Sequence, residues 1–121
     1  MTDRSTVIKA AEKYLFHGLI EQDGTKVPLA ENVVRIEQGK NTGDGREALV
    51  AALANVGMGM IEDVRNVRWI VEGEQAVAFY DLDLNISDLP VLVAERFRVV
   101  DGLITEIEVL FHAQAPIPVE K

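Results

Sequence analysis

The second half of the chain alternates apolar and polar residues with a period of two, and this pattern constrains the fold more than any other feature. A β-strand points successive side chains to opposite faces, so the alternation is typical of a sheet with one buried face. Two turn signals, Gly73-Glu74 and Asp101-Gly102, interrupt the alternation. The pattern predicts strands at residues 64–72, 75–84, 91–100 and 103–111.

The first half of the chain carries a helical pattern instead. Apolar residues recur at steps of three and four between Val7 and Leu19, which predicts an amphipathic helix. Asp44 has the position and chemistry of an N-cap for a second helix. Helices are thus segregated from a set of antiparallel strands, so the expected fold class is α+β. The expected elements are a first helix ending at Asp23-Gly24, a strand at 33–38, a loop at 39–45 and a helix at 46–56.

The length of 121 residues suits one domain, and we expect a single domain over residues 1–121 with its core at about 6–112 and an extended tail at 113–121. The chain has no cysteine, which excludes disulfides and thiolate metal sites and favours the cytoplasm. Its net charge of −8 disfavours nucleic acids and anionic membranes as partners. The polar residues 1–5 do not resemble the start of a signal peptide.

One carboxylate interrupts the apolar face of the strand at 91–100. Read at period two, Glu95 shares this face with four apolar residues, Val91, Val93, Phe97 and Val99. Because burial of an unpaired carboxylate is unfavourable, its pKa should rise or it should have a partner. Two interpretations follow. In the first, Glu95 is solvated, either because the register of the strand is shifted by one residue or because Glu95 reaches water at a sheet edge. In the second, Glu95 is a neutral acid that faces a cavity and donates a hydrogen bond to a ligand.

Three other polar residues are candidates for the same site, each with a plainer alternative. Tyr14 lies on the buried side of the first helix, where it could also be a core tyrosine. His17 follows one turn later and could be an ordinary surface histidine. Glu37 shares a strand face with Arg35 and could simply be paired with it in solvent. On the opposite face of strand 91–100, the arginines are expected to form ion pairs with glutamates of the next strand.

Short motifs in their order resemble the SnoaL-like, ketosteroid-isomerase-like proteins of the nuclear transport factor 2 superfamily. The segment 45–49 (GREAL) is similar to the start of a helix in that family, and 73–77 (GEQAV) to one of its hairpins. The segment 97–107 (FRVVDGLITEI) is similar to its last hairpin. The resemblance covers about residues 6–112. It implies a cone in which a curved antiparallel or mixed sheet wraps around the N-terminal helices, encloses an apolar pocket and usually forms a dimer.

The resemblance also implies a chemistry. In ketosteroid isomerases a helix tyrosine and an acid on a late strand hold a developing oxyanion, while a carboxylate on the first strand moves the proton. Tyr14, Glu95 and Glu37 match these three positions, with Glu in place of Asp at both acids. We therefore expect a pocket for a small apolar carbonyl compound and, in an enzyme, isomerase or cyclase chemistry without a cofactor or metal. The residues expected to line the pocket beside them are His17, Trp69, Phe79, Asp83 and Phe97.

Two other functions stay open. Members of the superfamily often keep the cone and lose the chemistry, which would leave a binding or assembly module. Limonene-epoxide-hydrolase-like relatives use an Asp–Arg–Asp arrangement, in which Asp83 could fill one position although Asp81 stands where the arginine is wanted. For either function we expect a homodimer through the outer sheet face. Its apolar residues are Ile70, Leu92, Ala94 and Leu110.

Overall fold

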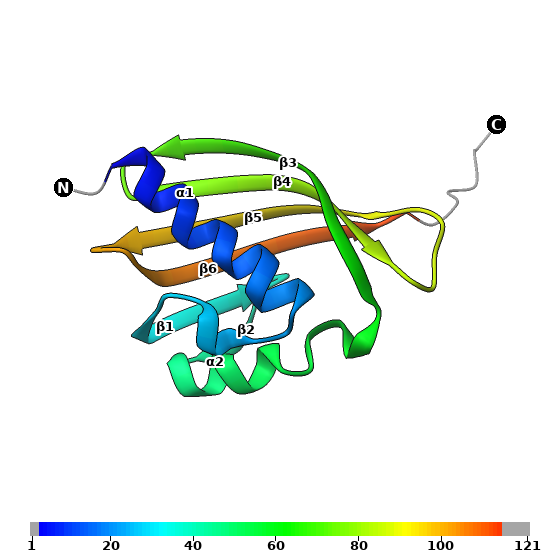
Figure 1. Cartoon of the computed structure of the whole chain (residues 1–121), viewed down its shortest axis with the longest axis horizontal. Coiled ribbons are helices and arrows are strands. Elements are labelled where there is room, and N and C mark those ends of the chain that lie inside the picture. Colours follow the sequence, from blue (N-terminus) through cyan, green and yellow to red (C-terminus); the bar gives the residue numbers. More distant parts are fainter. Residues whose placement is uncertain (1–2, 115–121) are drawn as a thin grey trace.

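Six strands form one mixed sheet that curves around two helices, and both helices lie on the same side of it (Figure 1). The structure, a computed structural model, describes residues 3–114. The strands are β1 (Leu29–Glu37), β2 (Lys40–Asp44), β3 (Ile61–Glu72), β4 (Gln75–Leu84), β5 (Val91–Val100) and β6 (Leu103–Ala113). Their spatial order is β2-β1-β6-β5-β4-β3, and within residues 3–114 only the β1–β6 pair is parallel. The expected α+β class with a curved mixed sheet is confirmed.

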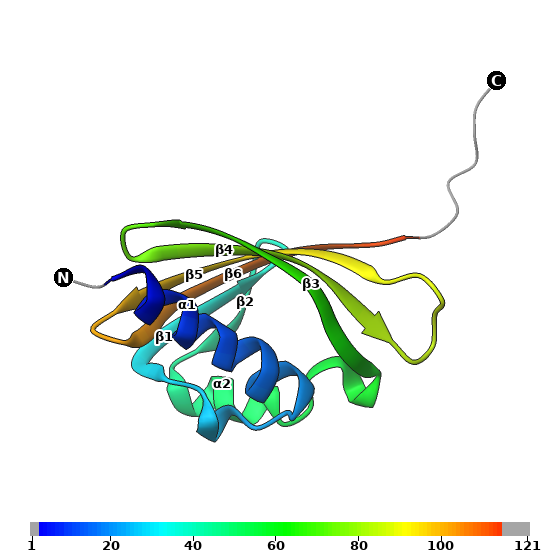
Figure 2. The ribbon, with the colours of Figure 1, turned by 45° about the horizontal axis from the view of Figure 1, so that its top comes forward.

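The first helix crosses the concave side of the sheet (Figure 2). It consists of α1 (Arg4–Lys13) and the π-helical segment η1 (Tyr14–Ile20) that continues it. Asp3 caps its start, because its carboxylate accepts a hydrogen bond of 2.9 Å from the backbone N–H of Thr6. The buried face contains Val7, Ala10, Ala11, Tyr14, Leu15 and Leu19. Its spacing of three and four residues is the one that predicted the helix. Among residues 3–114, no helix combines the length and the apolar character needed to cross a membrane.

The expected loop at residues 39–45 is wrong, because most of it is strand β2. The chain reverses at Gln38 and Gly39, which have φ angles of 50° and 82°, and then pairs antiparallel with β1. β2 is a largely exposed edge strand, so it needs only backbone pairing and tolerates the polar composition that is typical of loops. The proposed N-cap is also wrong. Asp44 belongs to β2, and Gly45 caps α2 (Arg46–Leu53) without a side-chain hydrogen bond.

The connection after α2 forms one wall of the cavity described below. It contains the 3₁₀ segment η3 (Val56–Gly59), so the second helix is shorter than the expected 46–56. Three successive residues have positive φ, Gly57 (66°), Met58 (49°) and Gly59 (77°). The other short segment, η2 (Gly24–Lys26), lies where the first helix was expected to end.

The register of β5 is the one that period two predicts. Glu95 pairs with Ala78 of β4 and Val109 of β6, and its side chain is on the buried face. On the opposite face, Arg96 lies 3.1 Å from carboxylate oxygens of both Glu106 and Glu108. The slipped register is therefore excluded, and the ion pairs expected between these strands are confirmed. β6 ends at Ala113; most of the expected tail, residues 115–121, lies outside the described residues.

Candidate functional site

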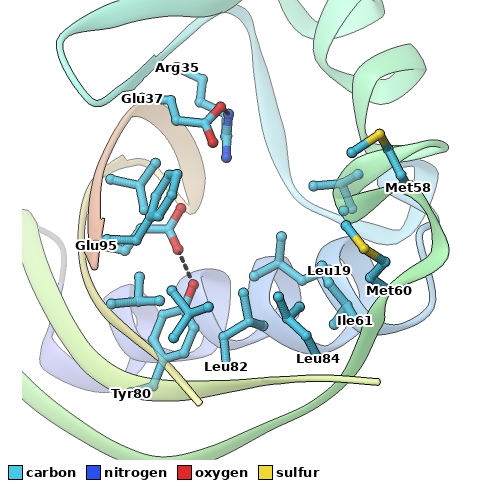
Figure 3. A pocket seen from close by; sticks show the side chains of 16 residues that line it. Leu19, Arg35, Glu37, Met58, Met60, Ile61, Tyr80, Leu82, Leu84 and Glu95 are labelled. Atoms are coloured by element: carbon cyan, nitrogen blue, oxygen red, sulfur yellow. Dashed lines mark hydrogen bonds and ion pairs between the residues drawn. The ribbon is translucent and has the colours of Figure 1, made fainter. Parts of the chain in front are cut away.

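A cavity of about 340 Å³ lies between the concave face of the sheet, η1 and the connection that contains η3 (Figure 3). Its volume is at the lower end of the usual range for small-molecule sites, roughly 300–1,000 Å³. Most of its lining is apolar. Figure 3 labels six of these side chains, Leu19, Met58, Met60, Ile61, Leu82 and Leu84. Four polar side chains also line the cavity, and they are Arg35, Glu37, Tyr80 and Glu95.

Glu95 is the buried acid of this cavity. Its strand directs it to the concave face, where only 1% of the residue is exposed. The hydroxyl of Tyr80, on the neighbouring strand β4, donates a hydrogen bond of 2.7 Å to Oε1 of Glu95. The other oxygen, Oε2, is buried and has no hydrogen-bond partner among residues 3–114. A buried polar atom without a partner is unfavourable in a folded protein, which makes Oε2 the atom to which a ligand would bind most favourably.

The environment of Glu95 raises the pKa of its carboxyl group. Burial raises the pKa of Glu95 to about 7, and the charge of Glu37 acts in the same direction. The charge of Arg35 and the hydrogen bond from Tyr80 act against burial and lower this pKa. Burial, together with the charge of Glu95, also holds the pKa of Tyr80 well above its usual value, so the phenol stays a hydrogen-bond donor.

Arg35 is the centre of a second polar cluster. Its Nε donates a hydrogen bond of 2.8 Å to the hydroxyl of Tyr14. Its Nη1 donates to Oε1 of Glu37 at 2.9 Å and to Oγ1 of Thr42 at 2.6 Å. Burial acts to lower the pKa of Arg35, but the opposing contributions of Tyr14, Glu95 and Glu37 raise it, so the guanidinium stays charged. β1 carries Arg35 and Glu37 on one face, and β2 supplies Thr42.

The two clusters face one another across the same end of the cavity. In Figure 3 the side chains of Arg35 and Glu37 point inward from one side, and Glu95 and Tyr80 approach from another. Met58 and Met60 lie away from this group, toward the apolar end. The cavity therefore has one polar end, with an acid that can lose or hold its proton near pH 7, and a long apolar remainder. A ligand with one polar end would match this division.

The structure brings together only part of the expected site. Glu37 and Glu95 both line the cavity, as expected. Tyr14 is fully buried and lies outside the lining, and its hydroxyl accepts a hydrogen bond from Arg35 instead of contacting Glu95. Tyr80 occupies the place beside Glu95 that was expected for Tyr14. The reason is topological, since Tyr80 is on the strand next to Glu95 and Tyr14 is on the helix that packs against the sheet.

The five residues expected to bind the ligand beside them lie outside the cavity lining. His17 is partly exposed, and its Nδ1 lies 3.0 Å from the carboxylate of Glu21. Trp69 and Phe97 pack against each other in the core, with ring centroids 6.4 Å apart. Phe79 and Asp83 lie on the face of β4 opposite to Tyr80, and Asp83 accepts a hydrogen bond from Arg65. Asp83 therefore does not lie in the cavity, where the epoxide-hydrolase arrangement would need it.

Tyr80 and Arg35 are the two residues of the polar end that sequence reasoning missed as ligand contacts. The signal for Tyr80 was present, because Ala76, Ala78, Tyr80, Leu82 and Leu84 form an apolar face against Asp81 and Asp83. The expected pocket lining contains the adjacent Phe79 instead. Arg35 was recognised only as a partner for Glu37, since nothing in the sequence shows that its guanidinium reaches Tyr14.

The curved sheet and the helices on its concave side form the fold that solved nuclear transport factor 2-like proteins share. The chain belongs to the family described as a domain of unknown function (DUF8021), which matches residues 1–111. No curated protein matches the chain.

Solved structures of the class share the fold. A candidate ketosteroid isomerase from Kribbella flavida is 22% identical with a TM-score of 0.74, over 100% of this chain and 93% of that one. An LEH-like epoxide hydrolase from M. tuberculosis is 21% identical with a TM-score of 0.70, over 89% and 84% of the two chains. A candidate SnoaL-like polyketide cyclase from Jannaschia sp. CCS1 is 18% identical with a TM-score of 0.69, over 92% and 91%. Identities this low establish the shared architecture alone.

Proposed function

We propose that the protein binds a small, mostly apolar carbonyl compound and moves a proton on the carbon next to its carbonyl group, as an isomerase does. The observation that carries this proposal is the buried pair of Tyr80 and Glu95 at the polar end of an apolar cavity. A carboxylic acid that keeps its proton near neutral pH can donate a hydrogen bond to a carbonyl oxygen.

Glu95 is the proposed donor to the carbonyl oxygen. Because the Tyr80 hydroxyl already donates to Oε1, the proton of the neutral acid belongs on Oε2, the atom without a partner. As the carbon loses its proton, negative charge builds on the carbonyl oxygen and this hydrogen bond strengthens. Donors that gain strength in the transition state are typically among the largest contributions to catalysis.

Glu37 is the proposed base. It lines the same end of the cavity, and its side chain is 33% exposed, so it reaches both the ligand and solvent. In the proposed step, a Glu37 oxygen takes the proton from the carbon and the C–H electron pair forms the enolate double bond. The same carboxyl then returns the proton to another carbon of the enolate, which completes an isomerisation. Arg35, held by Tyr14 and Thr42, positions Glu37.

The proposal is tested by proton exchange on a simple ketone. The measurement is the loss of the α-proton signals of 2-tetralone in deuterated buffer at pH 7, followed by proton NMR. We expect exchange above the buffer rate in the wild type, and a loss of about a hundredfold or more in Glu37→Gln, which removes the base. Glu72→Gln, at an exposed position on β3, is the matched control and should exchange like the wild type. A wild type that exchanges no faster than buffer, or a Glu37→Gln variant as fast as the control, would refute the enzymatic role.

A binding protein without catalysis is the second candidate, favoured by one specific observation. The proposed base is held by an ion pair of 2.9 Å with Arg35, so one of its two carboxylate oxygens, Oε1, already has a partner. A binding protein would take up the same ketones, and Glu95→Leu, which removes the hydrogen-bond donor, would weaken their binding. It would nevertheless leave the α-protons of 2-tetralone unexchanged. Binding and exchange, measured on one sample, therefore separate the two candidates.

A further inference from the structure

The polar end of the cavity offers two separate hydrogen-bonding positions. One is Oε2 of Glu95, which has no partner among residues 3–114. The other is Nη2 of Arg35, since the hydrogen bonds that Arg35 makes within the described residues use only Nε and Nη1. The guanidinium group points into the cavity (Figure 3). A ligand with a single oxygen could fill one of these positions and would leave the other empty.

The charges of the cavity lining balance when Glu95 is neutral. Besides Glu95, the lining has two charged residues, Arg35 and Glu37, and these two form an ion pair. A ligand anion would enter beside two carboxyl groups, and a ligand cation would enter beside a guanidinium group that is already held in place by three hydrogen bonds. Beside the buried side chains of Arg35 and Glu95, an unbalanced charge is unfavourable. The lining therefore favours an uncharged ligand.

The apolar remainder of the cavity places both ligand oxygens at the same end. Apart from Arg35, Glu37, Tyr80 and Glu95, the lining consists of aliphatic, methionine and aromatic side chains and one glycine. A polar group at the far end would lose its water without gaining a partner. The two oxygens that meet Arg35 and Glu95 must therefore lie close together in the ligand.

We infer that the cavity takes an uncharged apolar compound with two neighbouring oxygen acceptors at one end, a dicarbonyl or a hydroxy ketone, with one oxygen on Arg35 and the other on Glu95. This inference rests on the proposed function and adds Arg35 as a residue that determines specificity. A guanidinium group suits this role because it stays charged and its donors have a fixed direction.

Four probes on one naphthalene scaffold test the inference by fluorescence titration at pH 6.5. They are 2-acetylnaphthalene with one carbonyl, 1-(2-naphthyl)butane-1,3-dione with two, 2-naphthoate as the anion and 2-naphthylmethylammonium as the cation. We expect the dione to bind about tenfold more tightly than the monoketone, the effect of one hydrogen bond to a charged donor. Both charged probes should bind more weakly than the monoketone. Equal affinity for the dione and the monoketone, or tightest binding by either charged probe, would overturn the inference.

The arginine variants assign the second contact. Arg35→Lys should reduce the advantage of the dione over the monoketone to about threefold or less, because it loses the directed fork of donors. Arg98→Lys, at an exposed arginine on the outer sheet face, is the matched control and should keep the tenfold advantage. If circular dichroism shows that Arg35→Lys is folded and this variant also keeps the tenfold advantage of the dione, Arg35 is not the second contact. If Arg35→Lys does not fold, the comparison of the four probes on the wild type alone decides.

The outcomes also separate this inference from the function on which it rests. If 2-tetralone exchanges its protons and the monoketone binds as well as the dione, the proposed function stands and the two-oxygen ligand is refuted. If no naphthyl probe binds and no exchange occurs, both are refuted.

Discussion

The hydroxyl of Tyr80 donates a hydrogen bond of 2.7 Å to Oε1 of Glu95, and this single contact fixes which oxygen of the buried acid is left for a ligand. The two residues are on neighbouring antiparallel strands and point to the same concave face. A phenol beside a buried carboxyl stabilises the ionised form of that carboxyl. The strength of the acid in this cavity is therefore set by a neighbour as well as by burial.

Removal of the Tyr80 hydroxyl should make Glu95 a weaker acid. Burial raises the pKa of Glu95 to about 7, and the hydrogen bond from Tyr80 opposes this rise. In Tyr80→Phe we expect the pKa of Glu95 to increase by about one unit, the effect of a lost hydrogen bond to a charged group. The measurement is a pH titration of the carboxyl carbon of Glu95 by NMR, with exposed Glu72 as the internal control. A lowered or unchanged Glu95 pKa in the variant would contradict the assignment of this hydrogen bond.

The raised pKa of Glu95 should also make the folded state less stable as pH rises. The folded protein holds this proton up to about pH 7, whereas the unfolded chain releases it near the ordinary value of 4.5. Between these pH values the folded state binds a proton that the unfolded state lacks, so the free energy of unfolding falls with pH, by about 3 kcal/mol in total. The contribution is complete below pH 4.5 and is lost above pH 7.

Glu95→Gln isolates this effect. Glutamine keeps an oxygen for Tyr80 and cannot titrate, so urea unfolding of the variant should lack the loss of about 3 kcal/mol that the wild type shows from pH 4.5 to 8. All other carboxyl groups are shared by the two proteins, which makes the difference between their pH profiles specific to position 95. Parallel pH profiles for the wild type and the variant would show that Glu95 titrates normally.

Gly57 should be less tolerant of substitution than Gly59, although both have positive φ angles of 66° and 77°. A Cβ at Gly57 would lie 2.6 Å from Cγ1 of Ile61, which lines the cavity, whereas a Cβ at Gly59 would meet nothing within 4 Å. Gly59→Ala should therefore lose about 1 kcal/mol of stability from backbone strain alone. Gly57→Ala should lose more and also weaken binding of 2-acetylnaphthalene. Equal losses in the two variants would mean that Ile61 moves aside freely.

The outer sheet face should hold two copies of the chain together. Ile70, Leu92 and Leu110 on this face are exposed by 63%, 42% and 55%, which is unusual for large apolar side chains grouped on one surface. We expect a dimer at tens of micromolar by light scattering with size-exclusion chromatography. Leu110→Glu should convert it to a monomer, while Leu103→Glu, at another exposed leucine at the hairpin end of β6, should leave it dimeric. A wild-type monomer at these concentrations would refute the prediction.

The sequence predicted best the elements whose burial follows a strict period. β5 has one apolar face broken only by Glu95, so its pattern predicts a strand and allows the buried position of the acid as one of two interpretations, beside a slipped register. β4 was harder, because Phe79 and Tyr80 are adjacent aromatic residues and either could have faced inward. β2 was missed because an edge strand with exposed side chains has no apolar face to detect.

The contacts within the site could not be predicted for a different reason. Arg35 and Tyr14 are 21 residues apart and come from a strand and a helix, so their hydrogen bond depends on how these elements pack. Glu95 and Tyr80 meet because Ala78 pairs with Glu95 across the two strands, a register that local sequence does not specify. The residue types of the polar end could thus be proposed from the sequence, but their partners could not.

Because β1 pairs in parallel with β6, the cavity forms only when strands from both ends of the chain have joined the sheet. Arg35 and Glu37 reach the concave face beside Glu95 only because β1 lies next to the last strand, where Glu37 pairs with Val109. During synthesis on the ribosome, β1 therefore emerges long before the strand that holds it in the sheet. Such distant pairing slows folding, since a long loop must close before the contact stabilises anything. A chain released after Val100 would carry all four polar residues of the cavity and yet, we expect, bind none of the naphthyl probes.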